Sequence, residues 1–175
     1  MQVKNGVAVV PFKHKNGRWQ IFLQTRNNNP DKGKLEIPCE TIEYGETELD
    51  AMARCLLEEV NPAIDWYQLY GLNGEKLVKQ IFYADPDLPA SLMITPLHRL
   101  NTIRNGVSLF GTCVMAELAP NCEAVPHNEA TNPAWIDVLQ VERMAKQNPQ
   151  KFTYTIGAIL IACAALKRKP LNFSI

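Results

Sequence analysis

The sequence lacks an excess of charge of either sign. Lysine and arginine together number 18, and aspartate and glutamate also number 18. A balanced chain carries no net field that attracts nucleic acid or an anionic membrane surface. We therefore expect neither nucleic acid nor a membrane as a partner, although the balance leaves a local basic patch open.

Long hydrophobic runs are also absent. The longest, "IGAILIACAAL" from Ile156 to Leu166, has 11 residues. A helix that spans a bilayer needs about 20 residues, so this run predicts a buried helix, suited to the core or equally to a homodimer interface. The first residues, "MQVKNGVAVVPFKHK", lack the charged and then apolar pattern of a secretory signal, and we expect a cytoplasmic protein.

The five cysteines include no CxxC pair. An odd number without such pairs favours neither a disulfide framework nor a zinc knuckle. The sequence also lacks a Walker A loop, a GxGxxG turn, a G-x-S-x-G elbow and an H-E-x-x-H helix. With 175 residues, 46% of them hydrophobic, the chain can bury a core without disulfides or a structural metal. We expect one domain over residues 1–175.

Hydrophobic patterning predicts a mixed α/β domain. Strand-like runs cover residues 6–12, 18–26 and 107–118, with further candidates at 66–72 and 75–84. The run at 107–118 is apolar on both faces, which predicts a central strand. Later segments read as a loop at 122–133, a partly helical stretch at 134–146 and a helix within 152–169. Much of the region from 63 to 105 gives no clear pattern.

The clearest helix is "TELDAMARCLLEEV", from Thr47 to Val60. Thr47 and Asp50 have the spacing of a capping box, and Asn61-Pro62 ends the helix. Apolar residues recur at helical spacing and predict its core face. They are Leu49, Met52, Ala53, Leu56 and Val60.

Two glutamates follow a cysteine on the same helix. At about 100° per residue, Glu59 lies about 40° to one side of Cys55, and Glu58 lies about 60° to the other. Arg54 precedes Glu58 by four residues and can pair with it. Two carboxylates at the margin of a core suit a hard cation such as Mg²⁺. Adjacent glutamates are also common on solvated helix surfaces, so a merely charged helix face is the alternative.

The stretch from Glu40 to Pro62 resembles the Nudix box, whose pattern is G-x5-E-x7-R-E-U-x-E-E-x-G-U with U apolar. Five of the nine fixed positions match without a gap: Glu46, Arg54, Leu56, Glu58 and Glu59. The other four depart: Glu40 replaces the first glycine, Cys55 the second glutamate, Asn61 the last glycine and Pro62 the last apolar residue. The order of the predicted elements extends the resemblance loosely over the rest of the chain.

The resemblance to the Nudix hydrolase superfamily implies an α/β fold, a Nudix-like α/β/α sandwich with a mixed β-sheet. It implies a hydrolase that uses Mg²⁺ or Mn²⁺ and water to cleave a small molecule, a nucleoside diphosphate linked to another moiety. By position, Glu58 and Glu59 would bind the metal, Glu59 more directly. Glu46 and Arg54 would form an ion pair that orients the helix. Glu129, on a late loop, would serve as base or additional ligand, with an exposed loop glutamate as the alternative.

Cys55 stands where the family carries a principal metal ligand. An unperturbed thiol has a pKa near 8.5, is mostly neutral at pH 7 and is a soft, poor match for Mg²⁺. Glu40, in place of a glycine near the metal, is a candidate to supply the missing charge, and Glu43 adds a carboxylate to the same loop. A solvent-pointing Glu40 is the alternative. A second hypothesis joins Cys39 and Cys55 as ligands of a softer metal or as a redox pair, against the alternative that both are small buried side chains.

Two functions therefore stay open. One is a metal-dependent hydrolase of a nucleotide-derived diphosphate, weakened by Cys55. The other is a catalytically silent Nudix-fold module that binds a nucleotide or a protein partner. The thiol favours the second, and the retained Arg54, Glu58 and Glu59 favour the first. We expect substrate choice to depend on the region from 63 to 105.

Overall fold

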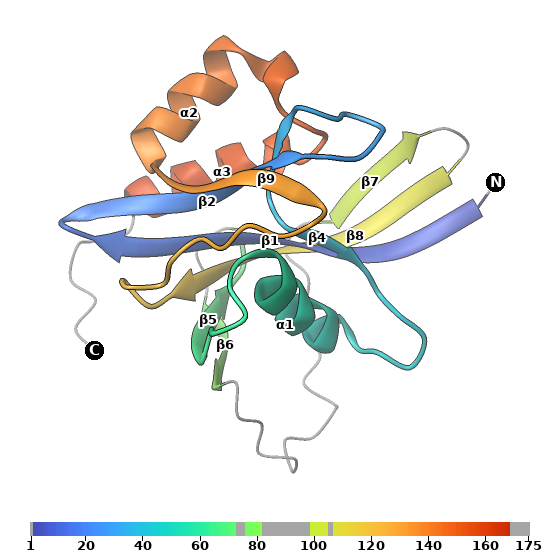
Figure 1. Cartoon of the computed structure of the whole chain (residues 1–175), viewed down its shortest axis with the longest axis horizontal. Helices are drawn as coiled ribbons and strands as arrows, with labels where there is room; N and C mark the ends of the chain where they lie inside the picture. The colour runs from blue at the N-terminus through green and yellow to red at the C-terminus, as the bar shows by residue number, and fades with distance from the viewer. Residues whose placement is uncertain (1, 73–75, 82–98, 105–106, 169–175) are drawn as a thin grey trace.

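A mixed β-sheet lies between helices on its two faces in the computed structural model of the protein, which describes residues 2–72, 76–81, 99–104 and 107–168 (Figure 1). Helix α1 (Glu48–Glu59) covers one face. Helices α2 (Val138–Gln147) and α3 (Ile156–Arg168) cover the other, and a short 3₁₀ helix, η1 (Pro149–Lys151), joins them. This architecture confirms the predicted α/β/α sandwich with a mixed sheet.

Nine strands form the sheet within the described residues. They are β1 (Gln2–Lys15), β2 (Arg18–Arg26), β3 (Leu35–Glu36), β4 (Cys39–Thr41), β5 (Trp66–Tyr70), β6 (Lys76–Ile81), β7 (Arg99–Arg104), β8 (Val107–Leu118) and β9 (Ala130–Asp137). The order is β3-β2-β1-β8-β5-β6, while β4 joins β1, β7 joins β8 and β9 joins β2. Strands β1 and β8 run parallel. Strand β8 lies between β1 and β5, which confirms the central position predicted from its apolar faces.

The predicted strands at 18–26 and 107–118 coincide with β2 and β8. Strand β1 begins at Gln2 rather than Gly6, because parallel pairing with β8 supports its first residues. Helix α1 begins at Glu48, directly after the predicted N-cap Thr47, and α3 begins at Ile156, inside the predicted range. In the region from 63 to 105, β5, β6 and β7 are strands, and residues 73–75 and 82–98 lie outside the described residues.

Strand β9 corrects the prediction for residues 122–146. It begins at Ala130, inside the predicted loop, and extends to Asp137, within the stretch predicted as partly helical. Helix α2 occupies the rest of that stretch from Val138, as predicted. The loop prediction was wrong because Asn132-Pro133 reads as a turn in isolation. In the structure both residues fall at a register shift between β9 and β2, so Pro133 interrupts no regular hydrogen-bonded ladder.

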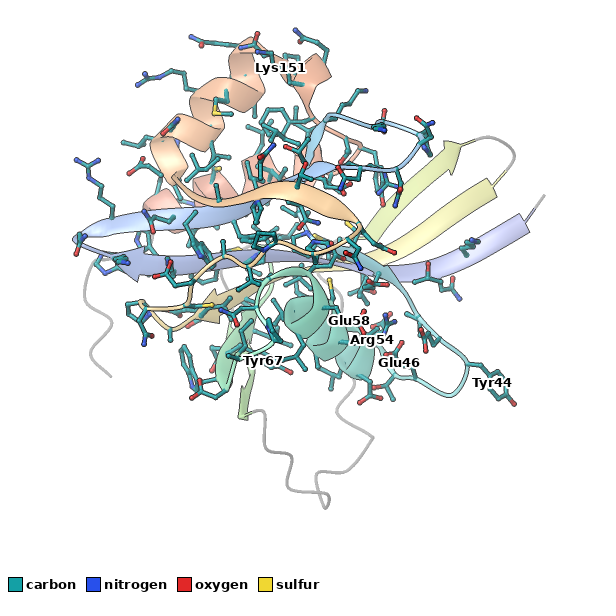
Figure 2. All side chains as sticks on the ribbon, viewed as in Figure 1. Tyr44, Glu46, Arg54, Glu58, Tyr67 and Lys151 are labelled. Carbon is teal, nitrogen blue, oxygen red and sulfur yellow. The ribbon has the colours of Figure 1, made fainter. Side chains whose placement is uncertain are left out.

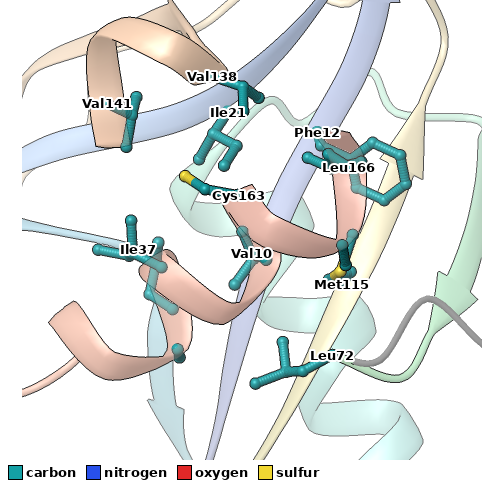
Figure 3. Close-up of a cluster of buried hydrophobic side chains, with 14 of the residues drawn as sticks. Val10, Phe12, Ile21, Ile37, Leu72, Met115, Val138, Val141, Cys163 and Leu166 are labelled. Atoms are coloured by element: carbon teal, nitrogen blue, oxygen red, sulfur yellow. The ribbon is translucent and has the colours of Figure 1, made fainter. Parts of the chain in front are cut away.

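The core has two parts, one on each face of the sheet. Alternation along β1 separates them: Val7 and Val9 pack toward α1, while Val10 and Phe12 pack toward α2 and α3 (Figure 3). Helix α3 adds its buried face to the second part, so its apolar residues belong to the core, and the homodimer alternative stays a prediction. No helix in the described part of the chain is long and apolar enough to cross a bilayer.

Candidate functional site

Strand β4 and the loop after it place the box helix beside β1. Strand β4 pairs with Gly6–Ala8, and the loop then turns at Gly45, whose φ of +82° is a left-handed conformation that glycine adopts readily. Helix α1 begins where Thr47 and Asp50 exchange hydrogen bonds, as the capping box predicts. The loop and the first turn of α1 therefore have a defined geometry before any ligand binds.

Arg54 is the centre of an ion-pair network on the outer side of α1 (Figure 2). Its Nε and Nη2 atoms donate to the two carboxylate oxygens of Glu46 at 2.9 and 3.0 Å, a two-point contact that confirms the predicted ion pair. Three further carboxylates lie near its Nη1: Glu40 at 3.1 Å, Glu58 at 3.6 Å and Glu43 at 3.9 Å. One guanidinium thus faces four carboxyl groups, which leaves an excess of negative charge.

The network affects its carboxyl groups differently. The hydrogen bonds from Arg54 hold the pKa of Glu46 below its ordinary value. Burial raises the pKa of Glu40, against the opposing effect of Arg54. The Glu40 side chain is 18% exposed. The alternative of a Glu40 that points into solvent is therefore wrong. The Glu40 carboxylate contacts Arg54, and its oxygen atoms are of the type that coordinates a hard cation.

Glu59 is buried, with 5% of its surface exposed. Gln24 Nε2 donates to its Oε2 atom, and the backbone N–H of Cys39 donates to its Oε1 atom at 3.0 Å. No cationic side chain among the described residues forms an ion pair with it. Burial, with smaller contributions from Glu40 and Glu36, raises the pKa of Glu59 to about 8. Without a cation nearby, this carboxyl group is therefore mostly protonated at neutral pH.

The buried face of α1 agrees in part with the predicted core face, since Met52, Leu56 and Val60 are buried as predicted. Its buried residues are Ala51, Met52, Cys55, Leu56 and Glu59. Leu49 and Ala53, predicted as core, are only partly buried. Cys55 and Glu59 are buried on this face together with the larger Met52 and Leu56, whereas the Glu58 side chain is 58% exposed. The two adjacent glutamates therefore occupy different environments, one in the core and one facing solvent.

Cys55 lies against Glu59, with 3.7 Å between its Sγ and Glu59 Oε1. Burial first, and then the charge of Glu59, raises the pKa of the Cys55 thiol well above its ordinary value. The Cys39 pKa is also raised by burial, and both cysteines are free thiols in the structure. Two neutral free thiols, with Cys55 buried and Cys39 partly buried, favour the alternative of small packed side chains over a soft-metal site or a formed disulfide.

Two residues of the site were missed in the sequence. Gln24 is buried on β2, and its Oε1 atom lies 3.0 Å from His127 Nε2. A signal for Gln24 existed, since it is a polar residue directly after the apolar run "IFL" of a strand. For His127 no spacing could have revealed the contact, because 103 residues separate it from Gln24.

Glu129 lies on the exposed segment before β9, on the same side of the molecule as the box. Its carbonyl accepts a hydrogen bond from the backbone N–H of Asn27 at 3.1 Å, at the end of β2. Its carboxylate is close enough to raise the pKa values of Glu40 and Glu36. The structure thus brings Glu129 into the electrostatic environment of the box, and its role as base or ligand stays a prediction.

The donor set of this region fits a hard divalent cation in its chemistry, because Glu40, Glu58, Glu59 and Glu129 offer oxygen atoms. The buried carboxyl group of Glu59 has only neutral donors as partners, and a cation would restore its charge. In the described part of the chain, however, no three Asp, Glu, His or Cys side chains converge closely enough to hold a metal ion. Glu40 and Glu58 face Arg54 instead, so both would have to turn toward Glu59 to complete a site.

A profile of the NUDIX domain matches residues 3–155, a range that includes the sheet, α1 and α2. This chain belongs to the NUDIX domain family. The match confirms the relationship inferred from the degenerate box. A comparison with curated proteins gives no match.

Solved structures of Nudix proteins share the fold at low sequence identity. A C. elegans Ap4A hydrolase in a binary complex is 14% identical with a TM-score of 0.63, covering 94% of this chain and 98% of that one. The possible asymmetric diadenosine tetraphosphate hydrolase from Jonesia denitrificans is 14% identical with a TM-score of 0.67, covering 97% and 98%. The NUDIX domain of Shewanella oneidensis NrtR, complexed with ADP ribose, is 15% identical with a TM-score of 0.60, covering 97% and 90%.

Proposed function

We propose that this Nudix protein is a hydrolase that cleaves a nucleoside diphosphate linked to another moiety, with Mg²⁺ or Mn²⁺ as its cofactor. The observation that carries the proposal is the buried carboxyl group of Glu59, which has only neutral hydrogen-bond donors beside an excess of carboxylates around Arg54. A buried acid without a counter-ion is costly unless it serves a cation or a reaction.

The substrate class is supported by the structural neighbours. Two of them are named as hydrolases of Ap4A, and a third was crystallised with ADP ribose. These compounds share a nucleoside joined through a chain of phosphates to a second group. We extend that shared chemistry to this chain as its substrate class.

Each site residue has a proposed task. Glu59, with Glu58 and Glu40, holds the cation, which when bound neutralises the charge that develops on the pyrophosphate oxygens. Arg54 and Glu46 keep the first turns of α1 against the box loop through their two-point contact. Glu129 approaches from the segment before β9 and acts as base for the attacking water or as a further oxygen ligand.

A second candidate function is a silent module that binds a nucleotide or protein partner without cleaving it. The neutral, buried thiol of Cys55 favours it, because a charged ligand is missing at a principal position. Losing one negative charge within a few ångströms of a divalent ion weakens its binding by about several kcal/mol even in a screened environment. Turnover by the parent protein decides between the two functions.

The deciding experiment measures Mg²⁺- and Mn²⁺-dependent release of products from dinucleoside polyphosphates and nucleoside diphosphate sugars. The parent is compared with Glu59→Gln, which keeps the shape of the side chain but removes its charge. Glu123→Gln is the matched control, since the exposed carboxylate of Glu123 pairs with Lys15, and only its backbone carbonyl, which the substitution keeps, contacts the box at Asn61. Cys55→Glu restores the family's ligand, and near-ultraviolet circular dichroism checks the folding of each variant.

We expect the parent and Glu123→Gln to turn over substrate alike and Glu59→Gln to lose about 100-fold or more of the activity. Turnover that survives Glu59→Gln would contradict the assignment of Glu59. An inert parent whose Cys55→Glu variant gains activity would support the silent module instead.

A further inference from the structure

Three polar side chains form a continuous hydrogen-bonded row beneath the box. His127 Nε2 lies 3.0 Å from Gln24 Oε1, and Gln24 Nε2 donates to Glu59 Oε2. The row joins the segment before β9, the end of β2 and the last turn of α1. Gln24 is almost fully buried, so water cannot easily replace either of its contacts.

The chemistry of the three groups determines the direction of the row. Once Glu59 has lost its proton, as cation binding requires, its carboxylate only accepts hydrogen bonds, so Gln24 must present its amide NH₂ group to Glu59. The amide oxygen then faces His127, and because this oxygen also only accepts, His127 Nε2 must carry the proton. One tautomer of one histidine thus determines the orientation of the amide that holds Glu59.

We propose that His127 and Gln24 are positioning residues that fix the orientation of the Glu59 carboxylate for cation binding. This inference rests on the proposed function of Glu59 and adds to it two residues outside the box. Metal ligands in proteins commonly depend on such outer partners, whose hydrogen bonds hold the ligand in one orientation.

The sequence change at Cys55 makes the row more important. The thiol is a weak donor, and its sulfur lies 3.7 Å from Glu59 Oε1. Cys39 N–H holds Oε1 at 3.0 Å, and the other oxygen has Gln24 as its donor. Gln24 therefore determines how the carboxylate is rotated about its last bond.

The row also connects Glu59 with the segment that carries Glu129. Asn27, three residues after Gln24, donates its backbone N–H to the Glu129 carbonyl at 3.1 Å and its side-chain amide to the Asn128 carbonyl at 3.4 Å. Strand β2 thus holds the segment through both His127 and Asn27. Loss of the His127 contact should disturb Glu59 and Glu129 together.

The test compares His127→Gln, which keeps an N–H donor, with His127→Leu, which has none. His14→Leu is the matched control, because His14 packs on Trp19 rather than near Glu59. The first readout is the ¹⁵N spectrum of the imidazoles in metal-free protein at about pH 9.5, above the pKa of Glu59, and it reports the tautomer directly. The second is Mn²⁺ affinity, measured by electron paramagnetic resonance without any substrate.

We expect His127 to carry its proton on Nε2, and Gln24→Leu to alter that signal. His127→Leu should bind Mn²⁺ about 10- to 100-fold more weakly than the parent, while His127→Gln and His14→Leu stay within a few-fold of it. Equal Mn²⁺ affinities of His127→Leu and His127→Gln, or a proton on Nδ1 of His127 alone, would overturn the positioning role of the row. A parent that binds no Mn²⁺ would overturn the proposed metal chemistry. The tautomer of His127, which is measured without metal, would then decide whether the hydrogen-bonded row exists.

Discussion

Glu59 is a carboxylic acid in surroundings that favour its neutral form. Its partners are an amide, a backbone N–H and a thiol, and its neighbours Glu40 and Glu36 are themselves acids. Burial, with smaller contributions from the charges of Glu40 and Glu36, raises its pKa from 4.5 to about 8, against the opposing effect of the hydrogen bonds from Gln24 and Cys39. Such a shift makes the free energy of unfolding depend on pH, because Glu59 keeps a proton in the folded state that the unfolded chain has lost.

The predicted pH dependence follows from that direction. Between about pH 5 and 8 the folded protein holds a proton that the unfolded chain has released, so the contribution of Glu59 to stability declines as the pH rises and is constant above its folded pKa. Compared with Glu59→Gln, the parent should lose up to about 1.4 kcal/mol of unfolding free energy per pH unit in this window. Urea unfolding of both proteins from pH 5 to 9.5 measures the difference, and Glu123→Gln should follow the parent. A constant difference across the window would refute the raised pKa.

Single residues were predictable where their partners are near in sequence. The pairing of Arg54 with Glu46 and Glu58 follows from the box spacing and from the turn of the helix, and the structure contains both contacts. Along the chain, Gln24 lies 35 residues from Glu59, and His127 lies 103 residues from Gln24. Contacts of this kind depend on how the sheet assembles, and one sequence carries no direct sign of them.

Strands β1 and β4 approach each other closely at Gly6. A Cβ atom added there would lie 2.7 Å from the Glu40 backbone oxygen. Gly6→Ala should therefore push β4 away from β1, destabilise the protein by about 1–3 kcal/mol and displace the loop that carries Glu40. Thermal unfolding followed by circular dichroism measures the loss.

Gly157→Ala is the matched control for that prediction. Gly157 lies in the first turn of α3, and a Cβ atom there would meet nothing within 4 Å. Alanine in a helix should stabilise the protein by about 0.5–1 kcal/mol. If Gly6→Ala were as stable as Gly157→Ala, the close approach of β4 to β1 would be disproved.

Secondary structure was predictable where its signals are local. Helix α1 has a capping box at its start and apolar residues at helical spacing, and its bounds follow from them. Strand β9 has no comparable signal, because its polar residues and Pro133 become a strand only through pairing with β2. The burial of Glu59 was missed for a related reason: its partners Gln24 and Cys39 lie on strands that only the assembled sheet brings to the helix.

Across the chain as a whole, a bound cation should act as a stabiliser that competes with protons. If Mn²⁺ binds at Glu59, a concentration of 100 times the dissociation constant should add about 2.7 kcal/mol of stability, or about 5–10 °C in Tm. The shift should be larger at pH 8.5 than at pH 6.5, since Glu59 must lose its proton to bind. Scanning fluorimetry with Mn²⁺, with EDTA, and with KCl at equal ionic strength measures it. A shift that KCl reproduces, or that persists in Glu59→Gln, would contradict binding at this residue.

Helix α3 lies just beyond the residues that the family profile matches, and its packing bears on how far the domain extends. The family profile ends at residue 155, and α3 begins at Ile156. Its buried residues nevertheless belong to the same core cluster as Val10 and Ile21. We propose that α3 folds as one unit with the matched region and cannot be removed without exposing that core.

The parallel pairing of β1 with β8 has a consequence for the order in which the protein can assemble. Gln2 pairs with Val107, and Phe12 pairs with Glu117, so each contact closes a loop of about a hundred residues. During synthesis β1, β2 and α1 leave the ribosome long before the strand that completes their sheet. His127 and its contact to Gln24 come later still. The candidate site is thus a late product of folding, and a nascent chain must keep the apolar faces of β1 from other partners until β8 arrives.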